Sequence, residues 1–377
     1  MRDEQRGRLG RLGQLFLAAA GTLCCMPAQA EAPCRIAYDI GSSGVRAGAS
    51  NSALVTRAGI DYLASLRAGR GLDDAIPPTI AALNETPRQA GFSRHCARVG
   101  GGFSAWRLAA QQDVGRLVAQ LVQVNAATGV AVLVIPQNAE GAYGYSGARQ
   151  LLGARLATSH VLDIGGGSLQ ISGAQTSYGQ ALGQKIWHQQ LCLALRNTAT
   201  QPCDLAPMSD GDLQKARALL AQRLEGAGAA FPHAVTMTAI SLPVTQGVAP
   251  AVDRLLQHAP GQRRLSQRDL GEAIGQSAGL TLAETARRLA IAPHYAAYLL
   301  SDMLLVEGVM QATGGEDMQI AEVDLTNLPG LLADDRAYRW GDDYGCYLQR
   351  LAQSGVDAYA SDPATCRADR AARRPDR

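Results

Sequence analysis

Two distant segments of this chain repeat one pattern, an apolar run that ends in Asp-Ile-Gly and continues into glycine and serine. Residues 38–44 read YDIGSSG, and residues 162–168 read LDIGGGS. Such a turn predicts a tight β-hairpin whose residues tolerate positive φ. A strand-end carboxylate beside free backbone N–H groups suits a metal-bound phosphate. Because the pattern occurs twice, it predicts two phosphate-binding hairpins that face each other across a cleft.

The first thirty residues have the composition of a targeting segment. Four arginines precede an apolar run over residues 15–26, and small residues follow up to Ala30. This order predicts a secretory signal peptide that is cleaved after Ala30, with a membrane anchor as the alternative. The run is too short for a stable membrane span, and no later segment is apolar enough to cross a membrane. The expected location is therefore the periplasm or the outside of the cell.

Six cysteines follow the predicted cleavage site: Cys34, Cys96, Cys192, Cys203, Cys346 and Cys366. An even number in an exported chain predicts disulfides, and six cysteines allow fifteen pairings. Pairing of near neighbours would join Cys192 to Cys203 and Cys346 to Cys366, which leaves Cys34 for Cys96. No pair has C-x-x-C spacing, so a cysteine metal site is not expected. A net charge of +2 gives no indication of nucleic-acid binding.

The distribution of apolar residues predicts an α/β chain with two domains after the leader. Residues 31–162 alternate strands and helices, with one long helix expected over 104–127. Residues 163–335 form a second, more helical domain. Residues 336–377 are polar, and they predict a disulfide-pinned appendage with a basic tail. The oligomeric state stays open.

Polar residues beside the hairpins suggest hydrolytic chemistry. Glu140 follows a short β-branched strand at a helix start, where it can orient or deprotonate a water molecule. Arg107 also begins a helix, a place where a cation needs an anionic partner. Asp39 and Asp163 can hold Mg²⁺ directly or through water. The alternatives are a solvated glutamate, a surface ion pair and ordinary turn aspartates.

Four blocks of the sequence resemble the exopolyphosphatase and guanosine-pentaphosphate phosphohydrolase (Ppx/GppA) family, in the order in which that family has them. They are residues 39–46, residues 104–109, residues 140–147 and residues 163–168. The resemblance implies a two-domain actin-like ATPase (ribonuclease H-like) fold with an interdomain cleft. It also implies Mg²⁺-dependent release of terminal phosphate from polyphosphate or a related phosphoanhydride. The implied catalytic residues are Glu140 and Arg107, the implied metal residues Asp39 and Asp163, and the implied phosphate ligands Gly41, Ser42, Ser43, Arg107, Gly165, Gly166, Gly167 and Ser168.

The chain also departs from the family pattern. Leu169-Gln170 stands where the family has Thr-Glu, so a carboxylate expected near the metal is replaced by an amide. The glycines of a nucleotide-side motif are absent near residues 234–238, and an Arg-Ala-Asp segment reads Tyr295-Ala296-Ala297. These changes keep two alternatives open: a catalytically weak protein that binds or senses phosphate, and a structural envelope protein with a vestigial cleft.

Overall fold

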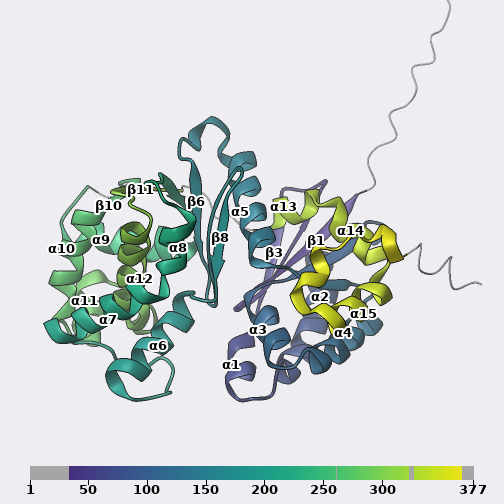
Figure 1. Cartoon of the computed structure of the whole chain (residues 1–377), viewed down its shortest axis with the longest axis horizontal. Coiled ribbons are helices and arrows are strands. Elements are labelled where there is room, and N and C mark those ends of the chain that lie inside the picture. Colours follow the sequence, from purple (N-terminus) through teal and green to yellow (C-terminus); the bar gives the residue numbers. More distant parts are fainter. Residues whose placement is uncertain (1–33, 260, 322–326, 367–377) are drawn as a thin grey trace, which may run out of the picture. The chain divides into compact units, whose positions relative to one another are not determined.

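The computed structural model describes residues 34–259, 261–321 and 327–366 (Figure 1). The predicted signal peptide and basic tail lie outside the described residues. The elements up to residue 155, which include the whole first sheet, are β1 (Arg35–Ile40), β2 (Gly44–Ala49), β3 (Val55–Gly59), α1 (Tyr62–Arg67), η1 (Asp73–Ala75), α2 (Ile76–Gln89), β4 (Ala97–Gly102), α3 (Ser104–Gln112), α4 (Val114–Thr128), β5 (Ala131–Val134), α5 (Gln137–Leu152) and η2 (Gly153–Arg155).

The second sheet follows, with most of the helices. Its elements are β6 (His160–Ile164), β7 (Leu169–Gly173), β8 (Ser177–Gln180), α6 (Gln184–Arg196), α7 (Asp210–Arg223), α8 (Glu225–Ala230), β9 (Met237–Ala239), the π-helix η3 (Pro243–Val248), α9 (Ala249–Leu255), β10 (Arg264–Ser266), α10 (Gln267–Ala278), α11 (Leu282–Leu289), α12 (Pro293–Ala312) and β11 (Asp317–Ile320). The C-terminal elements are α13 (Leu328–Ala333), α14 (Asp335–Asp342), α15 (Tyr344–Ser354) and η4 (Gly355–Ala360).

The two sheets share one strand order. The first runs β3-β2-β1-β4-β5, and the second runs β8-β7-β6-β9-β11 with β10 added beyond β11. In each sheet an antiparallel meander of three strands is continued by parallel strands that join the first strand of the meander. The repeated hairpin pattern in the sequence therefore marks a repeated α/β unit.

Two predictions about local structure were wrong. The helix expected over 104–127 is two helices, because Asp113 ends α3 in an extended conformation and its side chain accepts a hydrogen bond from Arg116 N (2.9 Å). Such an N-cap starts a new helix in a new direction. The second wrong prediction concerns the backbone of the second turn, where Gly165, Gly166 and Gly167 do not have the expected positive φ. In the first turn Gly44 does have a positive φ (153°).

The C-terminal segment is not a peripheral appendage within its described part. Apolar side chains of α13, α14, α15 and η4 join the core of the first sheet, and Tyr344 and Tyr347 hydrogen-bond the backbone of Val132 and Val134 in β5. In Figure 1 these helices (yellow) lie beside the first-sheet elements (purple and blue). The sequence misses this because polar surface residues conceal the buried aromatic side chains of α14, α15 and η4.

In the described part of the chain, no single helix has the length and apolarity needed to cross a membrane. The bent pair formed by α11 and α12 meets those two criteria jointly, and its two helices differ in direction by 97°.

Three disulfides join the pairs that near-neighbour pairing predicts: Cys34–Cys96, Cys192–Cys203 and Cys346–Cys366. We therefore expect the oxidised protein, denatured without reductant, to contain no titratable thiol at these positions. Reduction should lower the free energy of unfolding by about 2–4 kcal/mol per bridge, because each bridge restricts the unfolded chain. Thiol titration with a chromogenic disulfide checks the first expectation, and six reactive thiols would refute it.

Candidate functional site

The two glycine-rich turns face each other in the structure. A Cβ placed on Gly166 would lie 2.5 Å from Ser42 Oγ, and one placed on Gly167 would lie 2.9 Å from Ser104 Oγ. Real Cβ atoms do not approach other atoms so closely, so larger residues at 166 and 167 would require the Ser42 hydroxyl of the first turn and the Ser104 hydroxyl of α3 to move. The second turn therefore needs glycine for close approach, and the facing hairpins predicted from the sequence are present.

The start of α6 holds the second turn in place. The N–H groups of Gln184 and Lys185 donate to the carbonyls of Gly165 and Gly166 (2.9 and 2.8 Å). A Cβ on Gly183 would lie 2.3 Å from the carbonyl oxygen of Gly165, so only glycine fits there. Within the described chain, the N–H groups of Gly166 and Gly167 make no hydrogen bond; Gly166 lines the cavity described next, so its N–H group remains available to a phosphate oxygen.

A cavity of about 390 Å³ lies between the turns. Both turns line it together with three carboxylates, Asp39, Asp163 and Glu140. Two arginines, Arg46 and Arg57, also line it, and they are cross-strand partners on β2 and β3. The cavity thus combines acidic groups suited to a cation with basic groups suited to an anion.

Glu140 belongs to a buried polar network behind the turns. Arg107 Nη2 lies 2.7 Å from Glu140 Oε2 and also donates to Ser168 Oγ (3.1 Å), while Nη1 donates to the carbonyl of Ile135 (2.8 Å). Gln170 Nε2 donates to the same Glu140 Oε2 (2.9 Å) and to Ser168 Oγ (3.0 Å). Two donors fix Oε2, which leaves Oε1 as the oxygen available to a water in the cavity.

Gln170 therefore has a different neighbour from the one that the sequence suggests. It is 2% exposed and is not among the described residues that line the cavity, although it pairs across the strands with Asp163. Glutamine at position 170 therefore removes the carboxylate that the family pattern has there, and it also supplies an amide that donates a hydrogen bond to Glu140. A glutamate at 170 would place two carboxylates in contact.

Close packing on two sides fixes the helix that carries Glu140. A Cβ on Gly141 would lie 2.0 Å from Ser172 Oγ of β7, and a Cβ on Gly330 of α13 would lie 2.4 Å from Tyr143 Cα. The Tyr143 and Tyr359 hydroxyls both donate to Asp334 Oδ2 (2.6 and 2.7 Å). The C-terminal segment thereby anchors the first turns of α5.

Burial and neighbouring carboxylates raise the pKa of Asp163 and of Glu140. Burial raises the pKa of Asp163 to about 7, with Glu140 and Asp39 adding to the rise and Arg46 opposing it. Burial also raises the pKa of Glu140, while Arg107 lowers it and Asp39 raises it. Clustered acids that repel one another favour a bound cation or a proton.

This repulsion gives a stability prediction for the metal-free protein. The folded-state pKa of Asp163 (about 7) lies above its ordinary value of 3.8, so the folded form binds the proton more tightly. The stabilisation of the folded protein by protonation of Asp163 is complete below about pH 4, and it is lost as the pH rises through 7. Asp163 is partly exposed, so solvent screening limits the loss to on the order of 1–2 kcal/mol.

Urea unfolding in chelator at several pH values measures this effect. Asp163→Asn should flatten the decline in stability between pH 4 and 7. An unchanged slope in that variant would assign the decline to other groups.

The structure adds residues that the sequence does not single out. Ser241 and Asn327 line the cavity, and within the described chain Ser241 Oγ and Asn327 Oδ1 are buried without a hydrogen-bond partner. Gln184 also lines it, and its amide donates to buried Asp302 (2.5 Å). Arg57 also lines the cavity, and strand alternation could have indicated it, because every second residue of β3 faces the same side of the sheet as its partner on β2.

Two α/β units with one strand order, joined at facing Asp-Gly turns, define the actin-like ATPase fold with an interdomain cleft. Residues 120–327 match the Ppx/GppA phosphatase family, and the chain belongs to that family. The predicted fold and family are thus confirmed, and the family and fold support phosphohydrolase function.

Individual relatives are distant. An uncharacterized protein of Streptomyces coelicolor is 28% identical over 205 residues, which are 51% of this chain and 57% of that protein. The chain thus spans little more than half of that relative's length. The Ppx/GppA phosphatase of Aquifex aeolicus has 16% identity and a TM-score of 0.58 over 80% of this chain and 98% of its own. An exopolyphosphatase from Cytophaga hutchinsonii has 15% identity and a TM-score of 0.53 over 82% and 98%. At these identities the likeness concerns the fold alone.

Proposed function

We propose that this protein is an exported phosphohydrolase that releases terminal phosphate from polyphosphate or a related phosphoanhydride. The observation that carries the proposal is the placement of Glu140. Its carboxylate borders the cavity opposite two glycine-rich turns, while Arg107 and Gln170 fix one of its oxygens. A fixed base beside phosphate-binding amides is the arrangement that attack by water on a phosphoanhydride requires.

In this mechanism the N–H groups of Gly166 and Gly167 bind oxygens of the terminal phosphate, with Ser42 and Ser168 beside them. Glu140 Oε1 accepts a proton from the attacking water, and its raised pKa makes it a stronger base than a solvent-exposed glutamate. Arg46 and Arg57 lie where they can stabilise negative charge on the departing phosphate chain. Arg107, proposed from the sequence as a phosphate ligand and catalytic residue, contributes in addition by keeping Glu140 oriented.

The donor set of the cavity fits Mg²⁺. Asp39 and Asp163 offer carboxylate oxygens, which hard divalent cations prefer. Within the described residues these carboxylates do not form a compact group of three ligands, so water molecules would complete the coordination. When bound, Mg²⁺ would neutralise negative charge on the phosphate oxygens.

Export supports polyphosphate as the substrate, because an exported enzyme meets little cytoplasmic nucleotide. The leader that motivates this proposal lies outside the described residues, and the three disulfides are consistent with an oxidising compartment. Leu242 and Pro243 line the cavity close to the place where the family pattern has glycines, which argues against a nucleotide there.

A catalytically weak protein that binds or senses phosphate is the second candidate. Gln170 favours it, because the family has a carboxylate at this position. Phosphate release by the purified mature protein separates the two candidates, measured with and without Mg²⁺ on polyphosphates of several lengths and on nucleotides. Thermal stabilisation by polyphosphate without any release would support the binding protein instead.

A further inference from the structure

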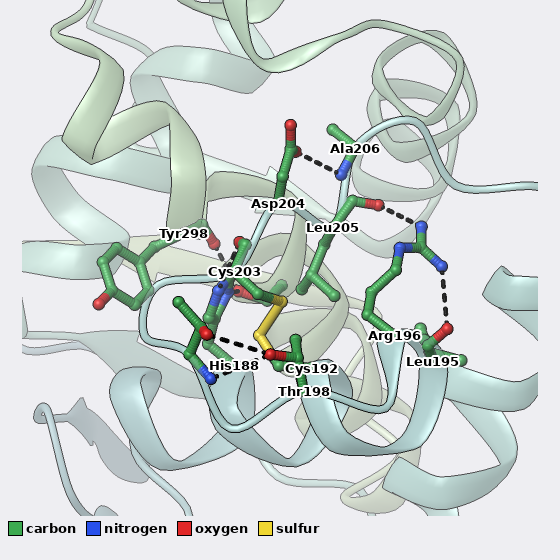
Figure 2. The surroundings of a disulfide bond; sticks show 12 residues. His188, Cys192, Leu195, Arg196, Thr198, Cys203, Asp204, Leu205, Ala206 and Tyr298 are labelled. Carbon is green, nitrogen blue, oxygen red and sulfur yellow. Dashed lines mark hydrogen bonds between the residues drawn. A yellow bond between two sulfur atoms is a disulfide. The ribbon is translucent and has the colours of Figure 1, made fainter.

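A second group of metal-ligating side chains lies outside the cavity lining, inside the core of the second sheet. His188 and Cys192 lie one turn apart on α6, and Cys203 is on the loop that follows it. One ligand atom from each lies within 4.8 Å of the other two, and all three residues are buried. Figure 2 shows His188 beside the Cys192–Cys203 disulfide, with Tyr298 on its other side.

The spacing of His188 and Cys192 is that of a helical ligand pair. Residues i and i+4 project from one face of a helix, as the two histidines of helical zinc motifs do. The Cα atoms of Cys192 and Cys203 are 5.9 Å apart. With Zn–S bonds of about 2.3 Å in a tetrahedron, two sulfurs lie about 3.8 Å apart, and rotation of the cysteine side chains can provide this separation.

The surroundings of His188 also suit a metal ligand. Ser301 Oγ donates to the carbonyl of Tyr298 (2.7 Å), and His188 Nδ1 lies 3.1 Å from Ser301 Oγ. If Nδ1–H donates to this oxygen, the lone pair of Nε2 faces Cys203. Metal-bound histidines commonly have such a second-shell acceptor, which fixes the tautomer.

In the oxidised chain Nε2 has a different partner. It lies 3.2 Å from the carbonyl oxygen of Cys203, which accepts a hydrogen bond when Nε2 carries the proton. The disulfide and a metal site would therefore use opposite tautomers of His188, and they exclude each other because both need the two sulfurs.

We propose that in the reduced chain His188, Cys192 and Cys203 bind one thiophilic divalent cation, for which Zn²⁺ is the best fit, and that the disulfide replaces this site on oxidation. Reduction by a dithiol transfers two electrons and two protons to the disulfide and yields a cyclic disulfide. Binding of the cation then releases two thiol protons and leaves two thiolates and a neutral imidazole as ligands. A water molecule or a further protein group completes the tetrahedron.

Cobalt substitution tests this proposal without any measurement of phosphate release. The full chain is reduced with a phosphine, Co²⁺ is titrated, and the thiolate-to-cobalt charge-transfer absorption is recorded with far-UV circular dichroism. We expect one Co²⁺ per folded reduced chain, displaced by Zn²⁺, and no such absorption from the oxidised chain. Ser301→Ala should weaken binding by roughly 10–100-fold through loss of the second-shell acceptor.

The other disulfides provide matched controls. Within the described residues no third ligand accompanies Cys34–Cys96 or Cys346–Cys366. The double variant Cys34→Ser/Cys96→Ser should therefore keep the absorption, whereas Cys192→Ser and His188→Gln should each lose it or weaken binding at least tenfold. The proposal is overturned if the absorption is absent from the reduced parent or survives Cys192→Ser/Cys203→Ser. A reduced chain that stays unfolded with and without metal overturns it too.

Discussion

Glu140→Gln should lower the turnover of phosphoanhydride hydrolysis by roughly 10²–10⁴-fold, the usual contribution of a positioned general base. The amide has nearly the same shape but cannot accept a proton from water. Arg107 keeps its hydrogen bonds to Ile135 and Ser168, so the variant should remain folded and should still bind phosphate. Steady-state kinetics, circular dichroism and phosphate-induced thermal shift together measure these three properties.

A matched control is available in the second sheet. Glu307 is also buried, and it pairs with Arg217 (2.8 Å) away from the cavity. Glu307→Gln makes the same chemical change and should leave turnover within about twofold of the parent at a temperature where both variants are folded. If Glu140→Gln is as active as the parent, Glu140 is not the base, and the binding protein becomes the better interpretation.

Arg107→Met should lower the free energy of unfolding by about 3–5 kcal/mol, since it leaves the Glu140 carboxylate buried without its charged partner. Arg107 and Glu140 are only 6% and 7% exposed, so solvent cannot replace the lost ion pair. Methionine preserves most of the volume of the arginine stem, which limits the contribution of an empty cavity. Urea unfolding at neutral pH measures the change.

The double variant Arg107→Met/Glu140→Gln separates charge from packing. It should recover at least half of the lost stability, because no unpaired buried charge remains. Arg217→Met serves as the comparison and should cost less, since the Arg217 side chain is 39% exposed in its pair with Glu307. A loss below about 1 kcal/mol for Arg107→Met would mean that water in the cavity solvates the Glu140 carboxylate well enough to replace its ion pair with Arg107.

Several elements are determined by the sequence because their causes are local. The paired Asp-Ile-Gly segments predict both hairpins, since strand apolarity and turn composition act within a few residues. Ser209 and Ser266 start α7 and α10 for a local reason, because each serine side chain caps its helix. Near-neighbour pairing of the cysteines predicts the three disulfides. The two Asp-Ile-Gly segments also belong to the blocks that resemble the family, which is why the fold and the family could be predicted from the sequence.

Other features depend on contacts between residues far apart in the chain. The return of α13–α15 to the first sheet depends on which faces other elements cover, and a one-dimensional pattern does not contain that information. The second-turn glycines are likewise required by the approach of Ser42 and Ser104 rather than by their own φ.

The site divides in the same way. Sequence alone singles out Asp39, Glu140 and Asp163, because carboxylates at strand ends and helix starts have recognisable positions. Only the tertiary structure shows that Gln170 on β7 donates a hydrogen bond to Glu140. Glu140 lies on α5, thirty residues earlier in the chain, so no local sequence pattern predicts this contact. Only the tertiary structure likewise shows that His188 and Cys192 lie beside Cys203. The helix places His188 and Cys192 on one face, and the loop after α6 returns Cys203 to that face. Residue type determines the chemistry that is available, and packing determines which groups meet.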